Sequence, residues 1–176
     1  MDEQKNTLLS LDVKFKVKDV LRYNLSVARK NIVNCIVMAF GLGVLVYFFY
    51  KMFTTGERID IFFARHIVLL IVPLLVFLMI PWRVWKITLT QMQQPAFAYG
   101  VTYTFSKEHI VLDTGEASEE VAWDVFMKIV ETKHDFRLYV NPISAQIIPK
   151  HNMNGEQLQA LRNIIREVAP DRSQLK

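Results

Sequence analysis

The side chains best suited to binding a charged partner are five carboxylates within the twelve residues 113–124. They surround a predicted turn, so a solvated loop is the simplest interpretation of the cluster. The alternative is an acidic docking edge for a cationic partner, formed by Glu116, Glu119 and Glu120. The other two carboxylates of the cluster belong to Asp113 and Asp124.

Lys150 is a second candidate for partner binding. It follows Pro149, and its ammonium would reach a phospholipid headgroup if the domain lies beside an anionic membrane surface. The simpler interpretation is that this pair closes a sheet before the last helix. Trp123 also has two interpretations: with Val125 and Phe126 beside it, a place in the hydrophobic core is more typical than a ligand platform.

The remaining chemistry-bearing residues do not form the patterns of common enzyme sites. The single cysteine, Cys35, allows neither an intrachain disulfide nor a thiolate zinc site. No serine has a G-x-S-x-G setting, and no glycine-rich phosphate loop occurs among the six glycines. We therefore expect a non-enzymatic protein with no catalytic residue, metal or cofactor. The histidines, which show no H-x-x-x-H or H-x-x-E pairing, are His66, His109, His134 and His151.

The elements that hold these side chains fall into a membrane part and a domain outside it. The chain is 52% hydrophobic, close to the value of a soluble protein, but most of the excess lies in two runs. The segment 32–53 is long enough for a helix to cross a bilayer. The segment 61–85 can also cross it, provided that Arg65 extends its guanidinium to the headgroups. We predict two transmembrane helices joined by a short external loop at 54–60. Two spans are too few to enclose a transport pathway.

The distribution of Lys and Arg predicts the orientation of this hairpin. Nine lie on the two outer flanks of the spans, against three in or beside the connecting loop. Because Lys and Arg are enriched on the cytoplasmic side, we expect a multi-pass membrane protein with both termini in the cytoplasm. The net charge of +4 is chiefly this topology signal, so we expect no nucleic-acid partner. The nine flanking residues are Lys5, Lys14, Lys16, Lys18, Arg22, Arg29, Lys30, Arg83 and Lys86.

Small and interfacial residues indicate how the spans pack and where they end. Ala39, Gly41 and Gly43 allow a neighbouring helix to approach closely. They serve either to pack the hairpin against itself or to form a homo-oligomer. The predicted membrane-interface anchors at the end of the second span are Trp82, Arg83, Trp85 and Lys86.

Outside the spans, the pattern predicts a domain of strands and one closing helix. Apolar and polar residues alternate from Leu9 to Lys18, and Asp19 then caps an amphipathic helix, so residues 1–31 form a strand and a helix. After a linker at 86–98, the region 99–176 ends in a helix. We expect a small antiparallel half-barrel closed by this C-terminal helix and joined by the N-terminal strand. Its other strands are predicted at 100–105, 109–113, 118–122, 128–131, 136–141 and 145–148.

The segment from Tyr103 to Lys150 resembles the C-terminal domain of the YcxB-like bacterial membrane proteins. The order of a strand, a helix and two spans before it is similar to that family as well. The resemblance implies a pleckstrin-homology-like (PH-like) half-barrel, and hence an α+β membrane protein, and it carries over no catalytic residue. His151 stands where such proteins often have a basic residue. The matching positions are Tyr103, Phe105, Ile110, Trp123, Lys128, Glu131, Thr132, Phe136, Tyr139, Ile147, Ile148, Pro149 and Lys150.

Three functions remain open at this point. The first is a non-enzymatic membrane protein that presents a cytoplasmic PH-like domain to a protein or to anionic lipid. The second is an immunity protein that neutralises a cognate toxin by direct binding at the membrane or in the cytoplasm. The third, an enzyme acting on lipid, has the least support because no acid–base or metal constellation is evident.

Overall fold

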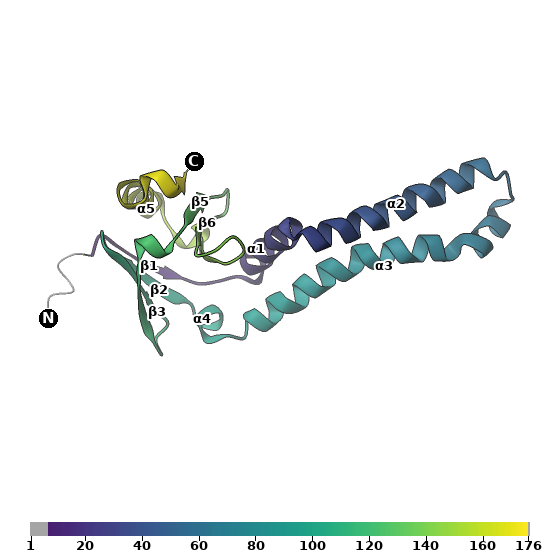
Figure 1. The fold of residues 1–176 in the computed structure, drawn as a ribbon. Coiled ribbons are helices and arrows are strands. Elements are labelled where there is room, and N and C mark those ends of the chain that lie inside the picture. Colours follow the sequence, from purple (N-terminus) through teal and green to yellow (C-terminus); the bar gives the residue numbers. More distant parts are fainter. Residues whose placement is uncertain (1–6, 176) are drawn as a thin grey trace. The chain divides into compact units, whose positions relative to one another are not determined.

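The computed structural model describes residues 7–175 of the chain (Figure 1). The first six residues of the predicted segment 1–31, including Lys5 of the charge count, lie outside the described residues, as does Lys176. The chain divides into two compact units. One comprises the residues up to Val20 together with those from Leu89 onward, and the other comprises Leu21–Thr88.

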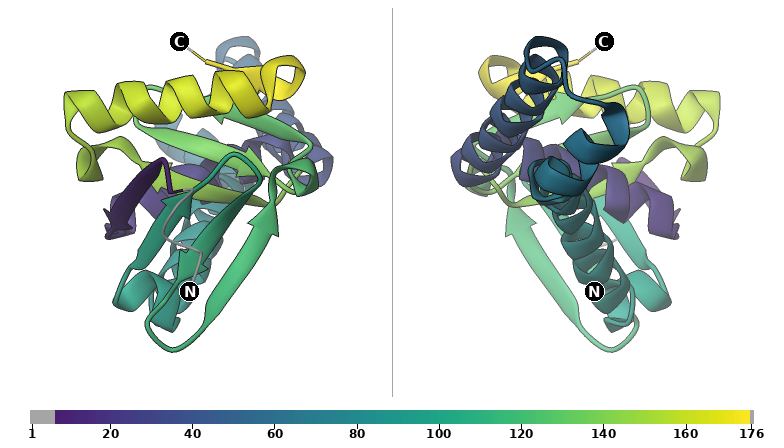
Figure 2. Two further views of the ribbon diagram at one scale, coloured as in Figure 1. Left: turned by 90° about the vertical axis from the view of Figure 1, so that its left-hand side faces the viewer. Right: turned by 90° about the vertical axis from the view of Figure 1, so that its right-hand side faces the viewer.

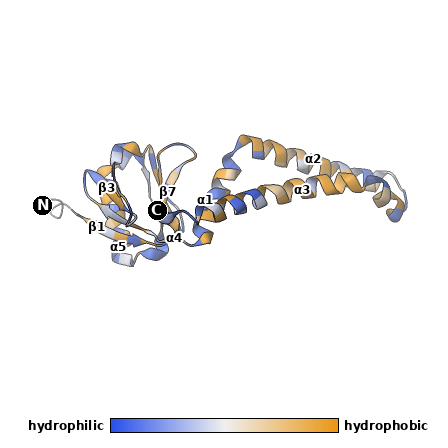
Figure 3. Cartoon of the chain, turned by 90° about the horizontal axis from the view of Figure 1, so that it is seen from below, coloured by the Kyte–Doolittle hydropathy of each residue, from blue (hydrophilic) through white to orange (hydrophobic). Residues whose placement is uncertain are grey.

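The unit Leu21–Thr88 is a helical hairpin. It contains most of α1 (Val17–Lys30), all of α2 (Ile32–Thr54) and most of α3 (Ile59–Gln91). The side chain of Asn31 starts α2 by accepting hydrogen bonds from the backbone N–H groups of the second and third helical residues. Figure 3 shows that hydrophobic colouring predominates along α2 and α3.

Both long helices have the length and composition to cross a membrane. The most apolar windows of α2 and α3 have mean hydropathies of 2.4 and 2.6, and only 11% of each window is buried within the structure. The core helix of a soluble protein would instead be largely buried. An apolar surface this extensive is unfavourable in water, so it favours an apolar surrounding for the hairpin.

The two helices pack through aromatic rings at one end and a glycine further along. The ring of Phe48 lies 5.4 Å from that of Phe62, centroid to centroid, and both side chains are buried. At Gly41, a Cβ would lie 3.3 Å from Cγ1 of Val76, so this glycine allows α2 to approach α3. Arg65 forms an ion pair with Glu57 in the connecting loop, with 2.6 Å between Nη1 and Oε1.

In the other unit, the N-terminal strand pairs with a strand from the far side of the hairpin. This sheet has the order β1 (Leu9–Val13), β2 (Val101–Phe105), β3 (His109–Asp113) and β4 (Ser118–Ala122), and all its pairs are antiparallel. In the β1–β2 register, Leu9 faces Phe105 and Val13 faces Val101. The alternation therefore predicted the start of β1 correctly, but the strand ends at Val13 and α1 already begins at Val17, where the alternation continued to Lys18. Helices α1, α2 and α3 are inserted between two adjacent strands.

A second sheet follows, in the order β7 (Ala145–Pro149), β6 (Asp135–Tyr139), β5 (Lys128–Glu131) and β8 (Ser173–Gln174). Helix α5 (Gly155–Val168) begins with a capping box between Asn154 and Gln157. Figure 2 shows α5, in yellow-green, lying beside the strands.

The six predicted strands are present within two residues of their expected bounds, but they do not form one continuous meander. The 3₁₀ helix η2 (Trp123–Val125) separates β4 from β5, so the strands divide into two sheets, and the strands of residues 7–175 form no closed barrel. The indole Nε1 of Trp123 donates to the carbonyl of Ser106 at 3.0 Å, which holds the chain out of the β3–β4 ladder at this point. Strand β8, which pairs in parallel with β5, was not predicted.

A single hydrophobic core joins both sheets and α5. Helix α5 contributes apolar side chains spaced three or four residues apart, which places them on one face. Because strands of both sheets supply core residues, the two sheets form one folded body. The fully buried core side chains are Phe105, Ile110, Ile129, Phe136, Leu138, Ile148, Leu161 and Ile165.

Gly100 precedes β2 and has a positive φ of 99°. A Cβ at this position would lie 2.7 Å from the carbonyl oxygen of Val13, at the end of β1. Only glycine meets both conditions without strain. The chain therefore re-enters the sheet through a position that excludes any side chain.

Candidate functional site

The acidic residues lie on and beside β4, at the edge of the first sheet. Within residues 7–175, β4 pairs only with β3, so its outer N–H and C=O groups face no other strand. Glu119 and Glu120 are both exposed, and they point to opposite faces of the strand. Glu116 is exposed in the turn before β4, where Gly115 has a φ of 81°.

One of these carboxylates has a partner within the sheet. The side chain of Glu120 lies 2.9 Å from Nδ1 of His109 on β3. An edge strand with unpaired backbone groups can accept an added strand from a second protein, and the glutamates would favour a cationic one. The same charges on an edge also prevent unwanted pairing between copies.

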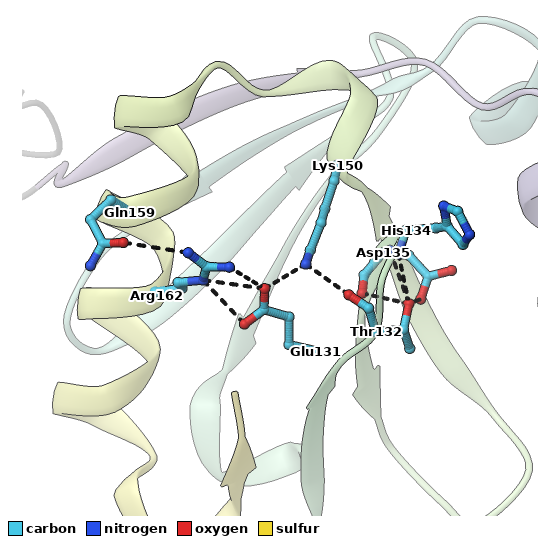
Figure 4. A network of polar contacts seen from close by, with 7 residues as sticks. All are labelled: Glu131, Thr132, His134, Asp135, Lys150, Gln159 and Arg162. Carbon is cyan, nitrogen blue, oxygen red and sulfur yellow. Dashed lines mark hydrogen bonds and ion pairs between the residues drawn. The ribbon is translucent and has the colours of Figure 1, made fainter. Parts of the chain in front are cut away.

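Lys150 lies in a buried charge network rather than on the open surface (Figure 4). Its Nζ donates to Oε1 of Glu131 at 2.5 Å and to the carbonyl oxygen of Thr132 at 2.7 Å. It also lies 5.2 Å from the centroid of the Phe136 ring, a cation–π distance. With 18% of its side chain exposed, its charge is directed mainly at Glu131.

Arg162 on α5 binds the same carboxylate. Its Nη2 lies 2.7 Å from Oε1 of Glu131, and its Nε lies 3.1 Å from Oε2, so the contact is bidentate. The hydrogen bond that Arg162 donates to Glu131 raises the pKa of Arg162 above its ordinary value, against the opposing effect of desolvation. The side chain of Glu131 is completely buried, and its charge is balanced by two cations from different elements.

A second buried ion pair adjoins the first through Thr132. Oγ1 of Thr132 donates to Oδ1 of Asp135 at 2.7 Å, and Nε of Arg137 donates to the same oxygen at 2.8 Å. Burial lowers the pKa of Arg137, but the hydrogen bond and charge of Asp135, with a contribution from Tyr139, raise it overall. Figure 4 shows Thr132 lying between Lys150 and Asp135.

These networks fasten elements together. Lys150 begins the 3₁₀ helix η3 (Lys150–Asn152), Arg162 belongs to α5 and Glu131 to β5, so the carboxylate holds three elements at one point. Within residues 7–175, no group of three or more His, Cys, Asp or Glu side chains could hold a metal ion. The charges here serve the fold.

The segment after β1 is also held by η3. The side chain of Asn152 accepts from the N–H of Lys14 and donates to its carbonyl, both at 3.2 Å. Asp19 was predicted to be the N-cap of the helix that follows β1, but α1 begins at Val17, so Asp19 is its third residue. The buried side chain of Asp19 accepts from the backbone N–H of Lys16 at 3.1 Å and lies 2.8 Å from Nε2 of His151. Trp123 lies in the core, as its neighbours predicted.

The four predicted interface anchors lie near the C-terminal end of α3. Trp82 is 66% exposed and Trp85 39% exposed. Both line an apolar groove of about 600 Å³ together with Leu21 and Leu25 of α1. Arg83 lines a separate cavity of about 480 Å³, while Lys86 is exposed and lines neither.

Residues 105–165 match the family model described as YcxB-like protein. This part of the chain is similar to the YcxB-like proteins. The match covers 61 of the 176 residues, from the end of β2 into α5, so it includes the acidic edge and the Glu131 network. The predicted resemblance is thus confirmed for the YcxB-like segment. No curated protein and no solved structure matches the chain.

Sequence reasoning missed the buried charge networks of the YcxB-like segment. One signal was present: Glu131 lies two positions after Ile129 on a predicted strand, so both side chains share the face that enters the core. A carboxylate on such a face requires a cationic partner. The identity of the partner, Arg162, depends on how α5 packs, and a strand pattern does not contain that information.

Proposed function

We propose that this chain is a non-enzymatic bacterial inner-membrane protein whose hairpin holds a PH-like domain at the cytoplasmic face, where the domain binds a protein partner. The insertion of the hairpin between β1 and β2 is the observation that carries the proposal. These strands pair with each other although α2 and α3 lie between them in the chain. A chain that enters a bilayer after β1 must return to the same side to form β2, which requires an even number of crossings.

The charges flanking the hairpin support the cytoplasmic orientation. Nine Lys and Arg residues flank its outer ends, against three at the connecting loop. The loop between α2 and α3, with Arg58 exposed, would then face the outside. Tryptophans at the end of α3 suit the headgroup region on the domain's side.

The arrangement of the strands supports a PH-like domain. Four antiparallel strands are followed by a second sheet with three antiparallel strands, and a C-terminal helix packs into the shared core. The YcxB-like match covers most of this region. Domains of the PH-like kind are suited to presenting an edge or a face to a partner, which fits a binding role.

The edge strand β4 is the surface we assign to the partner. It combines exposed backbone groups with Glu119 and Glu120 on the strand and Glu116 in the preceding turn. A cationic segment of the partner would pair with β4 through backbone hydrogen bonds and with the glutamates through charge. An immunity role is the case in which that partner is a toxin.

The test is affinity capture of the full-length protein from native membranes after charge reversal at the edge. The variant E119K/E120K should lose a protein that reproducibly accompanies the wild type. The matched control E156K/D171K makes the same change of charge at two exposed acidic residues of the C-terminal region, outside β3 and β4, and it should retain the partner. Equal capture by all three would overturn the assignment to β4. A toxin as the captured protein would identify the immunity role.

A further inference from the structure

The hairpin contains a cavity that neither its packing nor the proposed docking edge explains. It has a volume of about 480 Å³ and is lined by residues from the end of α1, the start of α2 and the C-terminal half of α3. All lining residues belong to the unit Leu21–Thr88. Most of the wall is apolar, and Val33, Val37, Val76 and Ile80 contribute to it.

The polar lining contains a cation that has no partner among the described residues. Arg83 makes no hydrogen bond or ion pair with any residue between 7 and 175. Asn31 also lines the cavity, and its Oδ1 is occupied by the backbone N–H groups of Val33 and Asn34. Its side-chain amide N–H groups donate to no described residue. The cavity therefore offers an unpaired guanidinium and amide donors, which match an anionic oxygen group.

The apolar and polar linings are ordered along the helices. Val76 precedes Arg83 by seven residues on α3, which corresponds to about 10 Å along a helix axis. On α2, Val37 follows Asn31 by six residues, or about 9 Å. On both helices, Val37, Val76 and Ile80 thus continue the apolar wall beyond the polar groups toward the connecting loop, while Val33, Val84 and Ile87 lie level with the polar groups or past them.

The polar groups and the apolar wall beyond them match the two layers of a membrane leaflet, the headgroups at the surface and the acyl chains beneath them. Arg83 lies between Trp82 and Trp85 in the chain, and tryptophans favour the headgroup region. Val37 and Val76 are then at the depth of the acyl chains. A free phosphate would use only the polar end, and a neutral amphiphile would leave Arg83 unpaired. An anionic phospholipid uses both ends.

We infer that this cavity binds one anionic phospholipid, with Arg83 against the phosphate and an acyl chain along Val37 and Val76. The inference rests on the proposed insertion of the hairpin into a membrane, but it does not depend on the docking role of β4. The lipid would be a bound component of the hairpin, held at the junction of α1, α2 and α3.

The experiment is native mass spectrometry of the full-length protein in detergent, titrated with phosphatidylglycerol or phosphatidylcholine. The wild type should bind one phosphatidylglycerol, and R83Q should weaken this binding by about tenfold, the effect of losing a charge-assisted hydrogen bond. R29Q removes an equivalent charge from the end of α1, outside the cavity, and should bind as the wild type does. V37W should also weaken binding because its indole fills the apolar end.

The control experiments distinguish binding of a whole phospholipid from binding of its phosphate group alone. L42W adds the same indole on α2 outside the cavity and should leave binding unchanged. Wild-type affinity in both R83Q and V37W would overturn the inference, as would equal binding of the two lipids. Displacement of the lipid by inorganic phosphate at similar concentration would also overturn it, because the site would then bind the anion alone. Loss of lipid binding with normal capture of a partner by β4 would leave the proposed function intact.

Discussion

Nε2 of His151 lies 2.8 Å from Oδ2 of Asp19, a residue 132 positions earlier in the chain. Asp19 is almost completely buried, and its Oδ2 also accepts a hydrogen bond from the backbone N–H of Lys16. The contact joins the start of α1 to the 3₁₀ helix that follows β7. It thereby holds the segment that leads from β1 toward the hairpin against the folded domain.

Replacing His151 should therefore destabilise the domain. H151A removes a hydrogen-bonding side chain from a buried carboxylate, and we expect a loss of about 1–3 kcal/mol in the free energy of unfolding. Denaturation of the full chain in detergent, followed by Trp123 fluorescence in a W82F/W85F background, measures this loss. The exposed substitution H134A is the control and should change the free energy by less than about 0.5 kcal/mol. An unchanged stability in H151A would show that the contact contributes nothing.

The buried carboxylate of Glu131 should be the most sensitive charge in the domain. E131A leaves Lys150 and Arg162 without their common anion, and breaking a buried ion pair of this kind costs about 3–5 kcal/mol. The same denaturation assay measures the loss. K107A removes an exposed ion pair with Glu167 and should cost no more than about 1 kcal/mol. Similar losses in the two variants would contradict a central role for Glu131.

The buried phenol of Tyr103 should make the folded domain less stable at alkaline pH. Burial raises the pKa of its phenol above the ordinary value of 10.0, so the folded protein retains the proton after the unfolded chain has lost it. The contribution is fully present below about pH 10 and is lost as the pH rises above it, by up to about 1.4 kcal/mol per pH unit. The free energy of unfolding of Y103F should therefore fall less steeply above pH 10 than that of the wild type. Parallel pH profiles for the two proteins would refute this assignment.

Gly100 should tolerate no side chain. G100A combines a positive φ with a Cβ only 2.7 Å from the Val13 carbonyl, and we expect a loss of more than about 1 kcal/mol. Gly155, at the start of α5, has open space around it and no positive φ, so G155A is the matched control. It should leave the free energy of unfolding unchanged or raise it slightly. Equal effects would mean that β1 and β2 can separate at this end without cost.

Much of the fold was predictable because its signals are local. The alternation from Leu9 predicted β1, and the turns between apolar runs placed six further strands within two residues. The break between the two sheets was not predictable, since it depends on the hydrogen bond from Trp123 to Ser106, 17 positions away. Strand β8 has two residues and pairs only because the chain after α5 returns to β5. A pattern so short carries no periodicity.

The candidate site was predicted less completely than the fold. The sequence identified Glu116, Glu119 and Glu120 as exposed acidic residues, and the structure places them on and beside an edge strand. It did not reveal that the charge of Lys150 is used within the domain, because Glu131 and Thr132 reach it only through the packing of β5 against η3. Long-range partners of single charges require the tertiary structure.

The insertion of a membrane hairpin between β1 and β2 is tested most directly by the accessibility of single cysteines. In a C35S background, R58C lies in the exposed loop between α2 and α3, and K133C lies in the exposed turn between β5 and β6. A membrane-impermeant maleimide should label R58C in intact spheroplasts and K133C only after permeabilisation. Labelling of both positions under the same condition would contradict the account, because the loop and the domain would then lie on one side of the membrane.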